Sequence, residues 1–216
     1  SSSAFSRFES VSGEERHFWL RRLHSLSGIV PIGGYLAFHL YENYQATRGP
    51  AAYNAMVRHL QETPFALALE IGVIAVPLFF HGIYGLFVTG TARPNVISNR
   101  YVRNWMYFLQ RATGVILFAF VIFHLWTTRL VDVRDHESVD LFRLMQSSVE
   151  NPWIYAFYVL GILSATFHLA NGIWSFSIVW GLTVGPRAQR RMMWVSGAVF
   201  VVLSLIGIQS IRAFRI

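Results

Sequence analysis

The dipeptide Phe-His occurs four times in this sequence, each time inside a long apolar segment, and it supplies His39, His81, His124 and His168. Successive members of this set are 42, 43 and 44 residues apart. A histidine in an apolar segment is costly unless it faces a protein interior, a cavity or a ligand. The chain must therefore fold so that four separate apolar segments turn a histidine toward one another or toward a bound group.

Composition and segment length indicate a membrane protein with several spans. Of the 216 residues, 54% are hydrophobic and 13% are charged. A helix needs about 20 apolar residues to cross a bilayer, and five segments are long enough: 22–44, 65–90, 103–129, 153–180 and 192–213. We therefore predict an all-α polytopic membrane protein, a single domain over 1–216, with four spans forming a bundle and the fifth lying at its periphery.

Local features refine this prediction. Residues 1–20 are polar and are expected to form a cytoplasmic N-terminal segment. Pro31 and Pro77 fall inside the first two spans and predict kinks, because membrane helices tolerate proline where neighbours satisfy the freed carbonyl. The two longer outer connections, 50–60 and 137–149, are predicted as short interfacial helices, with irregular surface loops as the alternative.

Charge and cysteine usage orient the chain and exclude several classes. All 18 basic residues are arginine. Ten lie on the side of the N-terminus, seven on the opposite side and one, Arg111, within a span; this bias places the N-terminus inside. The arginines gather at the ends of apolar spans, so the net charge of +7 reflects membrane topology and not nucleic-acid binding. The absence of cysteine excludes disulfides, thiolate metal sites and covalent haem attachment by this chain.

Topology places the four histidines at two depths. The first and third spans run outward, so His39 and His124 fall near the outer side and form an outer pair. The second and fourth spans run inward, so His81 and His168 form an inner pair. Two pairs of neutral imidazoles inside a helix bundle are the ligands that two six-coordinate haems require. Hydrogen bonds between helices are an alternative, as is zinc, although four histidines at two depths suit one ion poorly.

Other polar residues are candidates for binding the edges of such a cofactor. Arg111 lies within an apolar span and needs an anionic partner, for which a haem propionate is suited. His24 and Ser27 lie at the inner start of the first span and are further candidate donors. Glu70 is a carboxylate well inside an apolar segment, and two roles fit it equally: passing protons to a quinone, or accepting a bond from a helix partner.

A family resemblance rests on three features. The segment Arg22-Leu23-His24-Ser25-Leu26-Ser27-Gly28 is similar to a motif at the inner end of the family's first helix, the four histidines lie one on each of the first four spans, and five spans cover essentially the whole chain. With these features the chain resembles the cytochrome b membrane anchor of succinate:quinone oxidoreductases and fumarate reductases, of the single-subunit, five-helix, two-haem type.

The resemblance implies cofactors, partners and a location. It implies two haem b groups with the axial ligands paired as above, a flavoprotein subunit with FAD and an iron–sulfur subunit on the inner side, and quinone, commonly menaquinone, as substrate. It also implies a multi-pass protein of the bacterial inner membrane, and it leaves the number of complexes per assembly open. The quinone site is open too: His24 and Ser27 would serve an inner site, and Glu70 an outer one. Thr166 stands where some members carry a glutamate of a proton route, so that route is not expected here.

The leading prediction is an electron-transfer and anchor subunit of an enzyme complex, without the succinate site itself. Two other functions are alternatives. One is the cytochrome b subunit of a membrane hydrogenase or formate dehydrogenase, and the even spacing of one histidine per span argues against it. The other is a proton-coupled transporter without haem. It predicts charged partners beside the histidines, and within the spans the sequence offers only Arg111 and Glu70.

Overall fold

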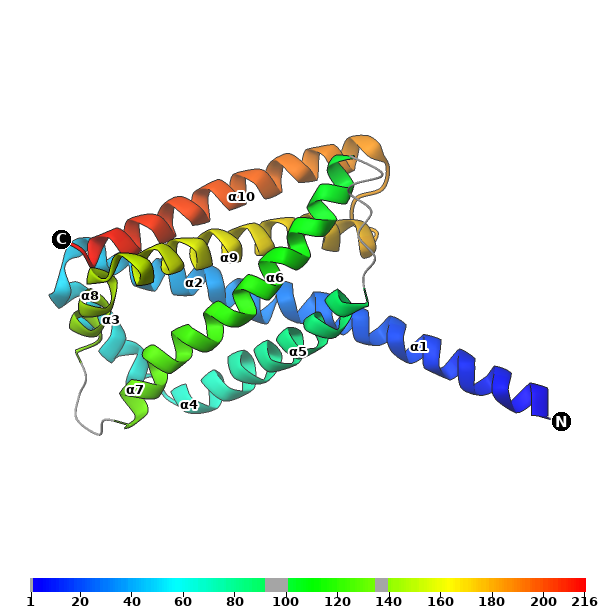
Figure 1. Ribbon diagram of the computed structural model, residues 1–216, viewed down its shortest axis with the longest axis horizontal. Coiled ribbons are helices and arrows are strands. Elements are labelled where there is room, and N and C mark those ends of the chain that lie inside the picture. The colour runs from blue at the N-terminus through cyan, green and yellow to red at the C-terminus, as the bar shows by residue number, and fades with distance from the viewer. Residues whose placement is uncertain (1, 92–100, 135–139) are drawn as a thin grey trace.

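The computed structural model describes residues 2–91, 101–134 and 140–216, and this part of the chain is helical with no strand (Figure 1). This confirms the predicted all-α polytopic membrane fold. The helices, in chain order, are α1 (Ser2–Ile29), α2 (Pro31–Tyr44), η1 (Gln45–Arg48), α3 (Pro50–Gln61), α4 (Ala66–Leu69), η2 (Glu70–Ala75), α5 (Val76–Gly90), α6 (Val102–Thr127), α7 (Arg129–Arg134), α8 (Leu141–Glu150), α9 (Pro152–Val179) and α10 (Pro186–Ala213).

Within these described ranges, four helical stretches are long and apolar enough to cross a membrane: Ala66–Gly90, Val102–Val131, Pro152–Val179 and Pro186–Ala213. They correspond to the second through fifth predicted spans. The last one begins at Pro186 and not at 192, because Gly185 adopts a positive φ of 85° and Pro186 then occupies the first helical turn, where its missing N–H costs nothing.

The first predicted span, 22–44, is helical but is divided between α1 and α2 by a turn at Val30. Pro31 has no N–H to donate to the carbonyl of Ser27, so the regular helical ladder is interrupted there. The predicted span is thus divided into two helices at Val30, and the predicted kink stays a prediction. In addition, α1 extends back to Ser2 and projects away from the bundle, so residues 2–20 are helical (Figure 1).

The proline in the second span has a different effect. Pro77 leaves the carbonyl of Val73 without its usual donor. The π-helical segment η2 (Glu70–Ala75) lies at this point, between α4 and α5. Wider turns of this kind accommodate an interruption without breaking the helix.

Helix α9 lies at the centre of the bundle and packs against α10, α6 and α1, while α10 also packs along α2 (Figure 1). The buried face of α9 carries small polar residues: the Thr166 hydroxyl is 2.8 Å from that of Ser204 on α10. Small residues with interhelical hydrogen bonds are the usual means of helix association in a membrane. By contrast, α5 and α6 contain no fully buried residue.

One end of the bundle is closed by η1, α3, α8 and the C-terminus, and we call it the capped end (Figure 1). It holds the main hydrophobic cluster: Ala46, Tyr53, Phe142, Met145, Val149, Tyr158, Ile211 and Phe214. Helices α3 and α8 agree with the predicted interfacial helices, except that residues 137–139 lie outside the described residues. The capped end corresponds to the predicted outer side. Arg93 and Arg100, from the predicted inner side, also lie outside the described residues.

Candidate functional site

The four histidines of the Phe-His dipeptides meet as two pairs. The ring centres of His39 (α2) and His124 (α6) are 5.9 Å apart with planes at 71°, and those of His81 (α5) and His168 (α9) are 6.2 Å apart with planes at 84°. An imidazole nitrogen binds a divalent metal at about 2 Å, so the ring centres of two imidazoles on opposite sides of one ion lie about 6 Å apart. The ring spacing of both pairs is compatible with two ligands on opposite sides of one metal.

The inner pair is oriented by main-chain carbonyls. His81 Nδ1 lies 3.0 Å from the carbonyl oxygen of His24, and His168 Nδ1 lies 3.1 Å from that of Gln110. A carbonyl oxygen only accepts, so in each ring Nδ1 carries the proton and donates. The Nε2 atoms are then unprotonated, which is the form that binds a metal.

Two glycines allow the inner rings to approach neighbouring helices. A Cβ atom at Gly28 of α1 would collide with the His81 ring, and one at Gly114 of α6 would lie 3.2 Å from His168 Cε1. No residue with a side chain fits at Gly28 without moving His81. These two positions therefore define where the inner ligands sit.

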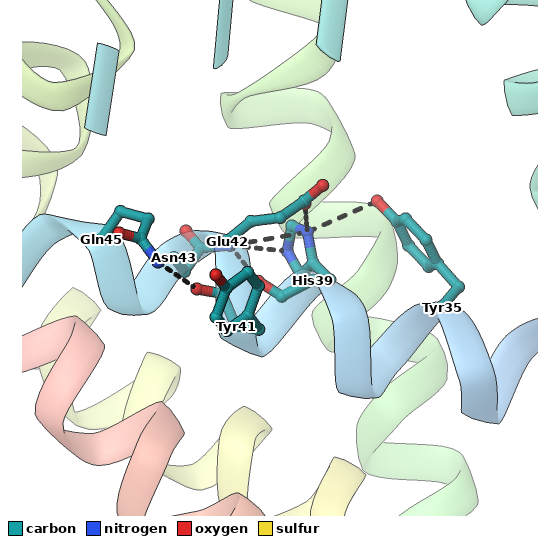
Figure 2. Close-up of polar contacts among 6 residues, drawn as sticks. All are labelled: Tyr35, His39, Tyr41, Glu42, Asn43 and Gln45. Carbon is teal, nitrogen blue, oxygen red and sulfur yellow. Dashed lines mark hydrogen bonds and ion pairs between the residues drawn. The ribbon is translucent and has the colours of Figure 1, made fainter. Parts of the chain in front are cut away.

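The outer histidines are oriented by side chains, and Figure 2 shows those around His39. His39 Nδ1 lies 3.4 Å from the Tyr35 hydroxyl and 3.5 Å from a Glu42 carboxylate oxygen. The Asn43 amide nitrogen lies 3.3 Å from His39 Nε2, so metal binding at that nitrogen requires Asn43 to turn away. His124 Nδ1 lies 3.3 Å from the hydroxyl of Tyr158 on α9.

Ser27 and His24, the predicted inner donors, lie directly beside His81. The His24 ring stacks on the His81 ring, with centres 4.1 Å apart and planes within 9°. Ser27 donates to the His24 carbonyl over 2.9 Å and lies 3.4 Å from His81 Nδ1. His24 Nε2 is buried without a hydrogen-bond partner, as is the hydroxyl of Tyr84, whose ring centre is 5.6 Å from that of His24. Two buried polar atoms without partners in one place suit an oxygen-bearing ligand.

Arg111 and Glu70 lie apart from each other. Arg111 donates to the Tyr107 carbonyl over 3.0 Å, its guanidinium lies over the Tyr107 ring, and its Nε is buried without a partner. Glu70 forms a two-pronged ion pair with Arg129, with distances of 2.7 Å from Nε and 2.8 Å from Nη2. Of the two roles open for Glu70, the structure shows the bond from a helix partner.

Two residues beside the ligands were missed from the sequence: Tyr158 and Thr113, whose Oγ1 lies 3.2 Å from His168 Nδ1. Helical spacing contained a signal for both. Tyr158 is three residues before Gly161, on the small-residue face of α9 that also holds His168. Thr113 is eleven residues before His124, about three turns along the same face of α6.

No three His, Cys, Asp or Glu side chains converge on a metal-binding position in the part of the chain that the structure describes.

Comparison with known proteins identifies the family. The sequence model of the family described as "Succinate dehydrogenase/Fumarate reductase transmembrane subunit" matches residues 93–207. A relative from Bacillus subtilis (strain 168), "Succinate dehydrogenase cytochrome b558 subunit", is 42% identical over 199 residues, which are 92% of this chain and 98% of the relative. The chain belongs to this family.

A second relative matches less of the chain. The "Succinate dehydrogenase 2 membrane subunit SdhC" of Mycobacterium tuberculosis (strain ATCC 25618 / H37Rv) is 29% identical over 118 residues, which cover 51% of this chain and 82% of that protein. The resemblance found in the sequence is thus confirmed: the chain is a transmembrane subunit of the succinate dehydrogenase and fumarate reductase family.

Proposed function

We propose that this chain is the di-haem cytochrome b anchor of a succinate dehydrogenase or fumarate reductase complex. His81 and His168 would hold the inner haem b, and His39 and His124 the outer one. When bound, the two haems supply one-electron carriers between an iron–sulfur subunit and quinone, for which we propose menaquinone. The observation that carries this proposal is the presence of two histidine pairs, each with its ring centres about 6 Å apart, as two ligands of one metal require.

The hydrogen bonds of the histidine rings support the same assignment. In a histidine that binds a metal, the N–H of the second ring nitrogen normally donates a hydrogen bond to a carbonyl, carboxylate or similar acceptor. This bond fixes the tautomer and the ring orientation. His81 and His168 do so to main-chain carbonyls. His124 has the hydroxyl of Tyr158 in the equivalent place.

Family membership favours this function over the two rivals. The relative from Bacillus subtilis carries "cytochrome b558 subunit" in its name and aligns along nearly its whole length. A hydrogenase or formate dehydrogenase subunit, or a transporter without haem, has no such support. We accordingly propose a flavoprotein with FAD and an iron–sulfur protein as partners on the inner side, and the bacterial inner membrane as the location.

The inner polar residues suit a propionate or a quinone oxygen. His24 Nε2 and the Tyr84 hydroxyl lack partners, and a carboxylate or carbonyl oxygen would satisfy either. Ser27 holds the His24 carbonyl, and the Nε of Arg111 provides a further donor. For an outer quinone site, we propose that Glu70 relays protons to the quinone, with Arg129 holding its carboxylate in place between transfers.

The decisive experiment is haem quantification in the purified complex, combined with a reduced-minus-oxidised spectrum. We expect two b-type haems per chain. His39→Ala and His124→Ala should each remove the same haem, and His81→Ala and His168→Ala the other one, because each pair shares one iron.

His59→Ala is the matched control, because His59 lies in the short helix α3 outside the spans and should leave both haems bound. Absence of haem from the intact complex would overturn the proposal and favour a proton relay or helix packing. Loss of different haems from the two members of one pair would overturn the ligand pairing.

A further inference from the structure

Tyr158 occupies a central position at the capped end that the sequence motifs did not indicate. Its side chain is 4% exposed, and its hydroxyl lies 3.3 Å from His124 Nδ1 and 3.7 Å from the sulfur of Met145 on α8. A buried tyrosine hydroxyl normally has a partner, and here His124 and Thr127 on α6 and Met145 on α8 lie beside it. It therefore connects the short helix α8 to the ring of His124.

The proposed role of His124 sets the direction of these bonds. If His124 binds iron through Nε2, as proposed above, its Nδ1 carries the proton and donates to the Tyr158 oxygen, and the Tyr158 hydroxyl can then donate to the sulfur of Met145. In this arrangement the Tyr158 oxygen accepts from His124 Nδ1–H, which favours the tautomer with an unprotonated Nε2.

Packing fixes the ring of His124 in the same orientation. Phe120 lies parallel to it, with ring centres 5.8 Å apart and planes within 13°. Phe120 is in turn held against Gly161, where an added Cβ would lie only 2.5 Å from the phenyl ring. Tyr158 meets His124 edge-on at 82°. The ring is thus confined on its face by Phe120 and at its edge by Tyr158.

We propose that Tyr158, supported by Met145, is a positioning residue that holds His124 in its ligand tautomer and lowers the reduction potential of the outer haem. This inference rests on the proposed function. A hydrogen bond accepted from Nδ1 makes the imidazole a stronger electron donor, which favours the oxidised iron. The inner pair uses main-chain carbonyls for the same purpose, so the effect of Tyr158 is specific to the outer haem.

The test is a redox titration of the intact complex carrying Tyr158→Phe, followed optically and by low-temperature electron paramagnetic resonance. This substitution keeps the ring and removes only the hydroxyl. We expect the midpoint potential of one haem to rise and its low-spin signal to shift, while the other haem is unchanged. The affected haem should be the one that His39→Ala removes.

Three further variants sharpen the test. Met145→Leu keeps the volume but removes the sulfur acceptor, so we expect a smaller shift in the same direction. Tyr155→Phe is the matched control on α9, because the Tyr155 ring contacts Arg215 at the chain end, and both haems should be unchanged. Thr113→Val, beside His168, should affect only the other haem.

Unchanged potentials in Tyr158→Phe, or equal shifts of both haems, would overturn the inference. If the Tyr158→Phe complex loses the outer haem, its potential cannot be compared, and Met145→Leu provides the test. A shift of the outer haem's midpoint potential alone would support the inference, and unchanged potentials would overturn it. The proposed function fails separately: wild-type complex without haem overturns it, whereas two haems with unchanged potentials overturn only the role of Tyr158.

Discussion

Close contacts between single residues determine where the inner histidines lie, and Gly28 gives the clearest case. A side chain at this position would collide with the His81 ring. We predict that Gly28→Ala displaces His81 and lowers the inner haem content well below one per chain, while the outer haem is retained. Overpacking of this kind typically costs about 1–3 kcal/mol in stability. Haem per chain and the reduced spectrum measure the effect.

Gly34→Ala is the control for this prediction. Gly34 lies on α2, and an added Cβ would meet nothing within 4 Å. Alanine there should preserve both haems and slightly favour the helix, by up to about 1 kcal/mol. A Gly28→Ala complex with two haems and an unchanged spectrum would contradict the close approach of His81 to α1.

At the residue scale, the sequence predicted which histidines would meet but not what surrounds them. Periodicity and topology were sufficient to pair His39 with His124 and His81 with His168. The contacts of Tyr158 and Arg129 could not be predicted, because their partners lie on other helices, 34 and 59 residues away in the chain. Such contacts depend on how helices rotate against one another, and an apolar span in a membrane gives few clues to its rotation.

At the scale of elements, the short helix α8 is attached to α3 through its N-cap. The Asp140 side chain accepts from the backbone N–H of Arg143 over 3.1 Å and from the Asn54 amide over 3.0 Å. Desolvation raises the pKa of the Asp140 carboxyl, but these hydrogen bonds and the charge of Arg143 outweigh it and lower the pKa below its ordinary value. The carboxylate form is thus favoured by the folded state.

We predict that Asp140→Ala lowers stability by about 1 kcal/mol at pH 7, the usual cost of losing an N-cap. Because the folded state depresses the pKa, the carboxylate contributes at pH values above its unfolded value of about 3.9 and stops contributing as the pH falls through the folded value. The difference in thermal midpoint between wild type and Asp140→Ala should therefore shrink as the pH is lowered from 5 toward 3. A difference that does not change with pH would argue against a charged cap.

The two prolines show what sequence can and cannot establish about an element. Both were expected to kink a span, and next to both the regular α-helical pattern is interrupted. Their outcomes differ nevertheless: a turn at Val30 before Pro31, and the π-helical η2 before Pro77. The missing N–H of a proline predicts that one hydrogen bond of the helix is absent. The conformation that the backbone then adopts depends on the surrounding packing.

At the scale of the whole molecule, the two sides of the bundle are stabilised differently. Helix α9 has a buried face and shares the Thr166–Ser204 hydrogen bond with α10. Helices α5 and α6 have no fully buried residue, yet they carry His81 and His124. Each histidine pair joins one of these two helices to α2 or α9. Bound haem would therefore stabilise the side of the bundle that has the least packing of its own.

This difference predicts the consequence of removing the cofactor. A ligand that binds only the folded state stabilises it by about 2.7 kcal/mol when present at 100 times its Kd. In complex prepared from a haem-deficient host, we expect hydrogen exchange to accelerate in α5 and α6, because His81 and His124 lose their cross-links. Exchange in α9 and α10 should change much less, because their contacts do not involve haem. Mass spectrometry of peptides from each helix provides this comparison within one sample. Equal acceleration in all four helices would show instead that the bundle unfolds as one cooperative unit, with haem stabilising all of it alike.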